Sequence, residues 1–92
     1  MAMTNINYMM NYVKKYLDGK QDRFEFDLGF SYELMTRWNK MRREDEEYAE
    51  VFNEWIGDNG VDAGRDLPDG QYKKLIRHQY NEVKDIAASG FA

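Results

Sequence analysis

The chain has 92 residues, a formal net charge of −4, no cysteine and one histidine, His78. Most zinc sites and nucleophile–base pairs are built from Cys and His, so this composition argues against both kinds of site. We therefore expect no enzyme, no catalytic residues, no metal site and no cofactor. The net negative charge also disfavours direct binding to nucleic acid or to an anionic membrane.

The composition is that of a globular domain. Hydrophobic residues make up 42% of the chain and charged residues 33%, and the length fits a single α-helical domain over 1–92. Two Trp, five Phe and seven Tyr supply the burial that a small domain without disulfides needs. The longest apolar runs have three residues and the N-terminus lacks the pattern of a secretory signal. We expect a cytoplasmic protein that does not enter a membrane.

The first predicted element is a helix over 5–17. Thr4 or Asn5 can cap its start, and Asp18-Gly19 supplies its end. Its apolar residues recur at helical spacing: Ile6, Met9, Met10, Val13 and Leu17.

The segment 22–30 fits two predictions. Phe24, Phe26, Leu28 and Phe30 alternate with polar residues or glycine, which is typical of a half-buried strand. The same segment begins with Asp22 and has Glu25 three residues later, which indicates a short helical turn with an N-cap. No second region of the chain alternates in this way, so the helical turn is favoured over the extended segment.

The region 32–56 has one apolar stripe, and the sequence leaves open whether it is one helix or two. A single helix over this range would be about 38 Å long, more than the expected width of a domain of this size. Asp45 can cap a second helix whose first turn carries Glu46 and Glu47. Pairs between Arg42 and Glu46 and between Arg43 and Glu47 would instead support one continuous helix. We favour a break or sharp bend at Asp45.

The run 57–60, Gly-Asp-Asn-Gly, is predicted to end that helix, and Pro68 suits the first position of the next one. An amphipathic pattern then extends to about Ala88 and ends at Ser89-Gly90. The predicted fold is all-α, a compact bundle of four main helices with an extra turn or extended segment at 22–30. Its expected core is Met9, Val13, Leu34, Trp38, Phe52, Trp55, Leu75, Ile76 and Val83.

Two features that resemble chemical sites have simpler explanations. The loop 58–69 contains four aspartates, but Gly60, Ala63 and Asp69 stand where a calcium-binding EF-hand has an acid or amide, a glycine and a glutamate. Aspartate and glycine are also the usual residues of a turn between helices. His78 falls on the polar side of the last predicted helix, where a surface histidine is expected.

The most informative charged feature is an acidic row. Glu47, Glu50, Glu54 and Asp58 recur at i, i+3, i+7 and i+11, which places them along one helical edge. This edge could meet a basic groove on a partner, or it could be a solvated face that keeps the domain soluble. The basic doublets at 14–15, 42–43 and 73–74 are scattered along the chain, which does not favour nucleic-acid binding.

We expect a small acidic adaptor or inhibitor that binds another protein, of a kind common among phage and mobile-element products. The predicted partner-binding residues are Glu47, Glu50, Glu54 and Asp58. The first alternative is a structural module that acts as a homodimer without an external target. The second is an inhibitor that mimics nucleic acid and occupies a nucleic-acid-binding protein. A metal-binding regulator using the loop 58–69 is a further alternative.

Overall fold

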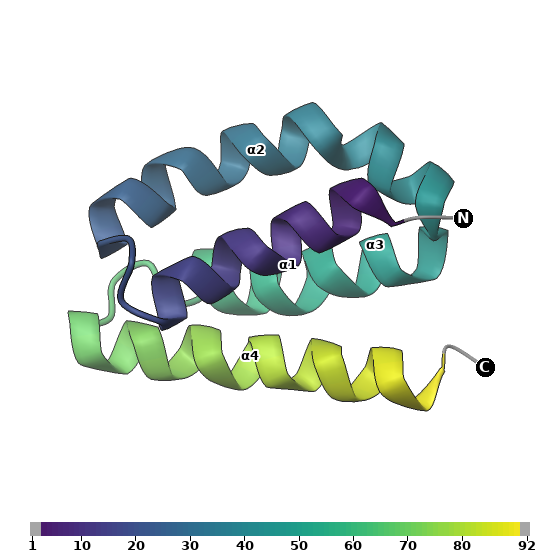
Figure 1. Cartoon of the computed structure of the whole chain (residues 1–92). Helices are drawn as coiled ribbons and strands as arrows, with labels where there is room; N and C mark the ends of the chain where they lie inside the picture. Colours follow the sequence, from purple (N-terminus) through teal and green to yellow (C-terminus); the bar gives the residue numbers. More distant parts are fainter. Residues whose placement is uncertain (1–2, 91–92) are drawn as a thin grey trace.

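The helices of this protein run alternately up and down around one hydrophobic core (Figure 1). The computed structural model describes residues 3–90. In chain order, its elements are α1 (Thr4–Leu17), α2 (Arg23–Glu44), α3 (Glu46–Phe52), the π-helix η1 (Asn53–Asp62) and α4 (Asp69–Ser89). The prediction of an all-α bundle is confirmed.

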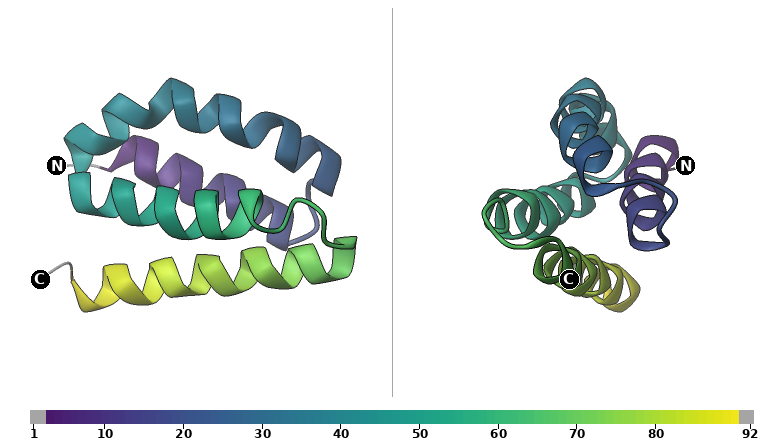
Figure 2. Two further views of the ribbon diagram at one scale, coloured as in Figure 1. Left: turned by 180° about the vertical axis from the view of Figure 1, so that it is seen from behind. Right: turned by 90° about the vertical axis from the view of Figure 1, so that its left-hand side faces the viewer.

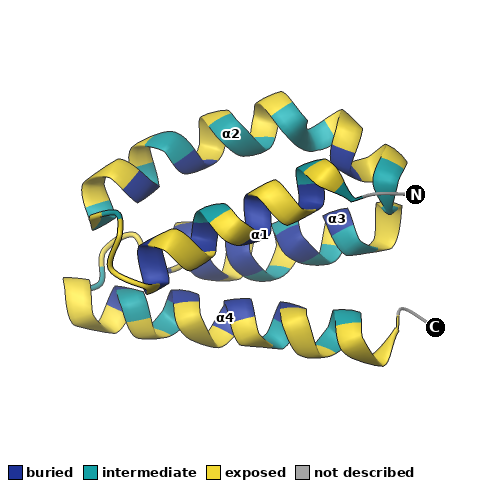
Figure 3. Ribbon diagram, in the orientation of Figure 1, coloured by how far each residue is buried: buried dark blue, intermediate teal, exposed yellow. Residues whose placement is uncertain are grey.

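Seen end-on, the bundle has four corners (Figure 2). α2 and α4 lie across from each other, and α1 and the α3–η1 segment occupy the two remaining corners. In Figure 3 the buried residues of each helix lie on the side that faces the middle of the bundle. Each corner of the bundle therefore has two neighbours.

The ambiguous segment 22–30 is helical, but it is not a separate turn. Asp22 Oδ1 accepts a hydrogen bond from Glu25 N at 2.8 Å, which is the predicted N-cap. The helix then continues without interruption to Glu44. Because side chains four apart share a helix face, Phe26 and Phe30 are both buried, whereas Phe24 and Leu28 are both exposed.

The predicted break at Asp45 is confirmed. Asp45 has extended backbone angles, φ −164° and ψ 105°, and its Oδ1 accepts a hydrogen bond from Tyr48 N at 3.1 Å. It caps α3 and turns the chain back along the bundle.

Two helix ends differ from the prediction. The helix does not stop at 57–60 but continues as η1 to Asp62, because Gly57 and Gly60 pack closely instead of ending the helix with a positive φ. A Cβ on Gly60 would lie 3.2 Å from Ile76 Cδ1 of α4. At the start of α1 the N-cap is Met3 rather than Thr4 or Asn5, and the cap comes from Glu44 at the end of α2. The ends at Gly19 and Gly90 agree with the prediction, with φ of 79° and 83°.

Aromatic rings pack against one another within the core. Tyr16 and Phe26 stack with centroids 4.5 Å apart, and Phe30 and Phe52 stack at 6.0 Å. Five of the nine expected core residues are buried: Met9, Val13, Phe52, Ile76 and Val83. The other four, Leu34, Trp38, Trp55 and Leu75, are only partly buried.

Candidate functional site

An exposed apolar row follows α2. Phe24, Leu28 and Met35 are 73%, 71% and 74% exposed, the small polar Ser31 lies between Leu28 and Met35, and the half-buried Trp38 ends the row. We call these five residues the α2 row. They are spaced by four, three, four and three residues, which is the spacing of a seam that packs against another helix. Such large apolar side chains are rarely left in water together without a function.

The α2 row forms one wall of a groove between α2 and η1. The larger part of this groove has a volume of about 310 Å³ and lies between Phe24, Leu28 and Val61. The remainder, about 230 Å³, lies between Leu34, Trp38 and Gly57. This explains why Leu34 and Trp38 are not in the core as expected, because they line an open groove.

The shape of α2 produces the groove. This helix arches away from η1 in its middle, while its two ends approach the rest of the bundle (Figure 2). On the η1 side, Gly57 and Val61 keep the wall low because one has no side chain and the other is small. The result is an elongated apolar hollow along the molecule.

The η1 wall gives the groove a negative rim. Asp58 and Asp62 both line it and both are exposed. Arg65, which lines the same groove, pairs with Asp62 at 3.0 Å, and within residues 3–90 Asp58 forms no ion pair. Asp27 also lines the groove, but it accepts a hydrogen bond from the Tyr72 hydroxyl. The free carboxylate on the rim is therefore that of Asp58.

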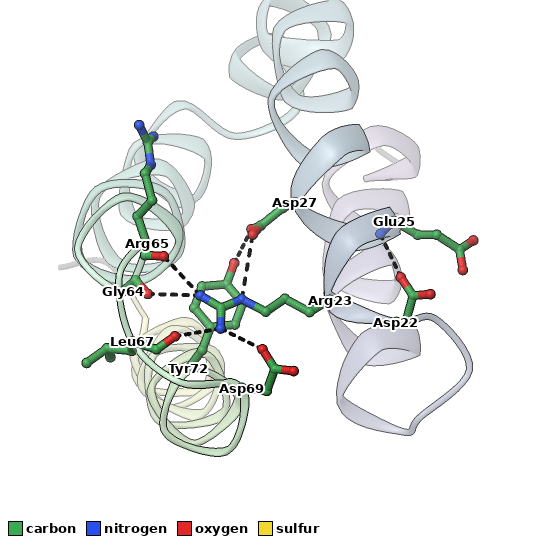
Figure 4. A network of polar contacts seen from close by, with 9 residues as sticks. All are labelled: Asp22, Arg23, Glu25, Asp27, Gly64, Arg65, Leu67, Asp69 and Tyr72. Carbon is green, nitrogen blue, oxygen red and sulfur yellow. Dashed lines mark hydrogen bonds and ion pairs between the residues drawn. The ribbon is translucent and has the colours of Figure 1, made fainter.

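Arg23 fixes one end of the groove (Figure 4). Its Nη1 donates to Leu67 O at 2.6 Å and to Asp69 Oδ1 at 2.8 Å, and its Nη2 donates to Arg65 O at 3.0 Å. The guanidinium also lies 4.0 Å from the centre of the Tyr72 ring. One side chain from α2 thus holds the loop that follows η1, since a guanidinium has five donors in a rigid plane.

The Tyr72 ring packs against the Arg23 guanidinium, and its hydroxyl donates a hydrogen bond to Asp27. Burial is the main cause that raises the pKa of its hydroxyl far above the ordinary value, and the hydrogen bond to Asp27 adds to the effect. The hydroxyl therefore stays protonated and remains a donor to the Asp27 carboxylate, which also lies 3.8 Å from Arg23 Nε.

The predicted acidic row is only partly regular. Glu47, Glu50, Glu54 and Asp58 are all exposed, but the helix is α-helical only as far as Phe52. Glu54 and Asp58 belong to the π-helix η1, whereas Glu47 and Glu50 belong to α3. Glu50 lies 3.9 Å from Arg42 Nη2, which also pairs with Glu46. Asp58 lines the groove between α2 and η1, and Glu47, Glu50 and Glu54 do not.

The two other candidates from the sequence are the loop 58–69 and His78. Within residues 3–90, no group of three or more His, Asp or Glu side chains could hold a metal ion. Much of the loop 58–69 is in fact helical, up to Asp62. His78 is exposed, as expected, with Nε2 3.9 Å from Glu82 Oε1. None of the helices described here combines the length and apolar character needed to cross a bilayer.

Sequence reasoning missed the α2 row because it divided α2 into two segments. Phe24 and Leu28 were assigned to an ambiguous turn, and Met35 and Trp38 to the next helix. Read as one helix, their spacing would have shown a second apolar face beside the core face of Phe26 and Phe30.

Comparison with protein-family models, curated proteins and solved structures gave no match. The function is therefore argued from this structure alone.

Proposed function

We propose that this protein is a small acidic adaptor or inhibitor, and that the α2–η1 groove binds an amphipathic helix of another protein. The observation that carries this proposal is the α2 row, with Phe24, Leu28 and Met35 exposed in line along one wall of an apolar groove. We also propose a cytoplasmic location, on the sequence argument that the chain has no cysteine to oxidise.

A helix is the occupant that fits the groove. The α2 row runs from position 24 to position 38, about 21 Å at the rise of an α-helix. Its alternating spacing of three and four residues accepts the side chains of a second helix between its own. Met35 supports this role because its unbranched side chain adapts to different partner surfaces. A helix of about 14 residues would cover the row.

The charge of the groove favours a basic partner. Among residues 3–90 none forms an ion pair with Asp58, and the whole chain carries a net charge of −4. Lys or Arg next to the apolar face of the partner helix would meet this carboxylate and increase the rate of encounter. A second copy of this protein fits less well, because each copy carries a net charge of −4 and the two copies would repel each other.

The groove supports binding of a helix better than the acidic row supports mimicry of nucleic acid. A mimic needs an unpaired row of acidic groups, but in the row of Glu47, Glu50, Glu54 and Asp58 the Glu50 carboxylate lies 3.9 Å from Arg42 Nη2 and Asp58 lines the groove. Binding through the groove depends on Asp58 and not on the three glutamates.

Two synthetic peptides test the proposal. Each is a 14-residue helix with leucine at three-four spacing, and the remaining positions are all lysine in one peptide and all glutamate in the other. The Trp38 side chain lines the groove, so its fluorescence reports binding directly, with Trp55 replaced by Phe to remove the second signal. The lysine peptide is expected to bind and the glutamate peptide is not.

Matched variants locate the site. The double variant Leu28→Ser, Met35→Ser should weaken binding of the lysine peptide at least ten-fold, since it removes two apolar anchors. The control is Tyr32→Ser, which removes a 64% exposed side chain from the same helix but outside the groove lining. Equal affinity of the double variant and the control would overturn the proposal. So would a free protein that sediments as a dimer and becomes a monomer in the double variant, because the row would then be a homodimer interface.

The charge argument has its own pair of variants. Asp58→Asn is expected to weaken binding of the lysine peptide, whereas Glu47→Gln with Glu54→Gln should have a smaller effect. The reverse order would assign the binding surface to the acidic row instead of the groove.

A further inference from the structure

A second charged surface lies along the contact between α1 and α4. Lys73 Nζ of α4 lies 5.3 Å from the centre of the Tyr16 ring of α1. One turn further, Arg77 Nη2 donates to Leu17 O at 3.2 Å. Lys84 Nζ lies 5.6 Å from the Tyr80 ring centre. The first two contacts join α4 to α1, and Lys84, seven residues after Arg77, lies about two turns further along the same face of α4.

α1 and the turn after it add two more cations. The Asp18 carboxylate has Lys14, Lys20 and Arg77 as its positive neighbours, and the hydrogen bond from Lys14 is the first cause of the lowered pKa of Asp18. Lys14 itself pairs with Asp18 at 2.8 Å. We call the five cations the α1–α4 row: Lys14, Lys20, Lys73, Arg77 and Lys84.

The α1–α4 row has excess positive charge. Lys14 is neutralised by Asp18, but within residues 3–90 no carboxylate lies within ion-pair distance of Lys73, Arg77 or Lys84. Lys84 and Arg77 are exposed, and Lys73 is partly exposed. The basic doublets at 14–15, 42–43 and 73–74 lie on different helices, as predicted, but the packing of α1 on α4 brings Lys14 and Lys73 to the contact between these two helices. Three cations without an ion pair on a net acidic chain, Lys73, Arg77 and Lys84, are the feature to be explained.

The α1–α4 row and the α2–η1 groove lie on opposite sides of the bundle. In the end-on view of Figure 2, the contact between α1 and α4 is diagonally across from the space between α2 and η1. Two partners could therefore occupy the two surfaces at the same time without touching each other.

We propose that the α1–α4 row binds an acidic segment of a second protein, and that the chain is an adaptor that joins two partners. The binding surface stands on the α1–α4 contacts alone, whereas the bridging role rests on the proposed function of the groove. The presence of two binding surfaces favours an adaptor over an inhibitor, because an inhibitor needs only one bound partner.

A protein segment fits this surface better than nucleic acid does. The Tyr16 and Tyr80 rings are 3% and 8% exposed and lie under the lysines, so they cannot stack with bases. A long polyanion would also be repelled by the net charge of −4, which acts over the whole molecule. A short acidic segment contacts the row while remaining away from the acidic side.

The test uses a 12-residue polyglutamate peptide and a 12-base-pair DNA duplex as probes in low salt. Backbone amide shifts should move at Lys73, Arg77 and Lys84 on addition of the peptide. The variant Lys73→Gln, Lys84→Gln should bind the peptide about five-fold more weakly, because it removes two exposed ion pairs. The control Lys40→Gln, Arg43→Gln removes the same charge from the exposed side of α2 and should change affinity less than two-fold.

Three results would overturn the proposal. They are shifts that do not map to the α1–α4 row, equal weakening in the variant and the control, and tighter binding of the duplex than of the peptide at the same residues. Failure here is distinguishable from failure of the groove. Leu28→Ser with Met35→Ser should leave polyglutamate binding unchanged, and Lys73→Gln with Lys84→Gln should leave binding of the lysine peptide unchanged.

Discussion

Glu44, the last residue of α2, caps the first turn of α1 through Asn5. The two residues are 39 positions apart, yet the Glu44 carboxylate accepts hydrogen bonds from Asn5 N at 2.8 Å and from Asn5 Nδ2 at 2.7 Å. It also accepts Ile6 N at 2.9 Å. The first N–H groups of a helix have no partner within the helix and form its positive end, so a carboxylate is favoured there. This contact joins the two ends of the α1–α2 hairpin.

Removal of this cap should destabilise the protein. We expect Glu44→Ala to lower the free energy of unfolding by about 1–2 kcal/mol, the usual cost of a lost N-cap. For a domain of this size, each kcal/mol corresponds to about 4–8 °C in Tm. Thermal melts followed by circular dichroism measure the change, with the exposed Glu47→Ala as the control. Equal melting temperatures for the two variants would contradict the role of Glu44.

The same contact predicts a dependence on pH. Burial acts to raise the pKa of Glu44, but the hydrogen bonds from Ile6 and Asn5 outweigh it and lower the pKa below 4.5. A carboxylate with a lowered pKa in the folded state contributes stability above its unfolded value, and this contribution is lost as the pH falls further. The wild type should therefore be more stable than Glu44→Gln at pH 7, and the difference should close as the pH drops below 4.5. Urea unfolding at several pH values tests this, and a constant difference would refute it.

Among the surface cations, Arg23 should be the one whose replacement lowers the free energy of unfolding most. It donates to the carbonyl groups of Gly64, Arg65 and Leu67, so Arg23→Ala removes several charge-assisted hydrogen bonds at once. We expect a loss of about 2–3 kcal/mol, and Arg23→Lys should recover little of it because an ammonium cannot reproduce the planar set of donors. Arg65→Ala is the matched control, since that side chain is 73% exposed and pairs with Asp62 alone. A full rescue by lysine would show that only the charge matters.

Two glycines provide a direct test of the η1–α4 packing. A Cβ on Gly64 would lie 2.8 Å from Leu75 Cδ2 and 3.0 Å from the backbone oxygen of Gly60, which cannot move aside. Gly64→Ala should therefore cost about 1–3 kcal/mol. Gly70 has nothing within 4 Å of its Cβ position and lies in α4, so Gly70→Ala should be neutral or stabilising by up to about 1 kcal/mol. Chemical denaturation of both variants gives the comparison, and a stable Gly64→Ala would contradict the close packing.

The sequence by itself determined the helices and most of their ends. The spacing of Ile6, Met9 and Val13 predicts α1, and Asp45 marks the break before α3, because caps and amphipathic periodicity depend on residues within one or two turns of each other. The glycine of the turn after α1 was predicted for the same reason. The run 57–60 does not end the helix as predicted, since Gly60 packs against Ile76 and Gln79 of α4, a part of the chain that it meets only after folding.

Only the tertiary structure decided which surfaces could serve a function. Phe24, Leu28 and Met35 are as apolar as the core residues, and their spacing within α2 places them on one face, but only the packing of the bundle leaves that face exposed. Lys14 and Lys73 come together because α1 packs on α4. The opposite wall of the groove, with Gly57, Asp58 and Val61, and the partner helix of the α1–α4 row are distant in sequence, so these surfaces depend on packing between helices.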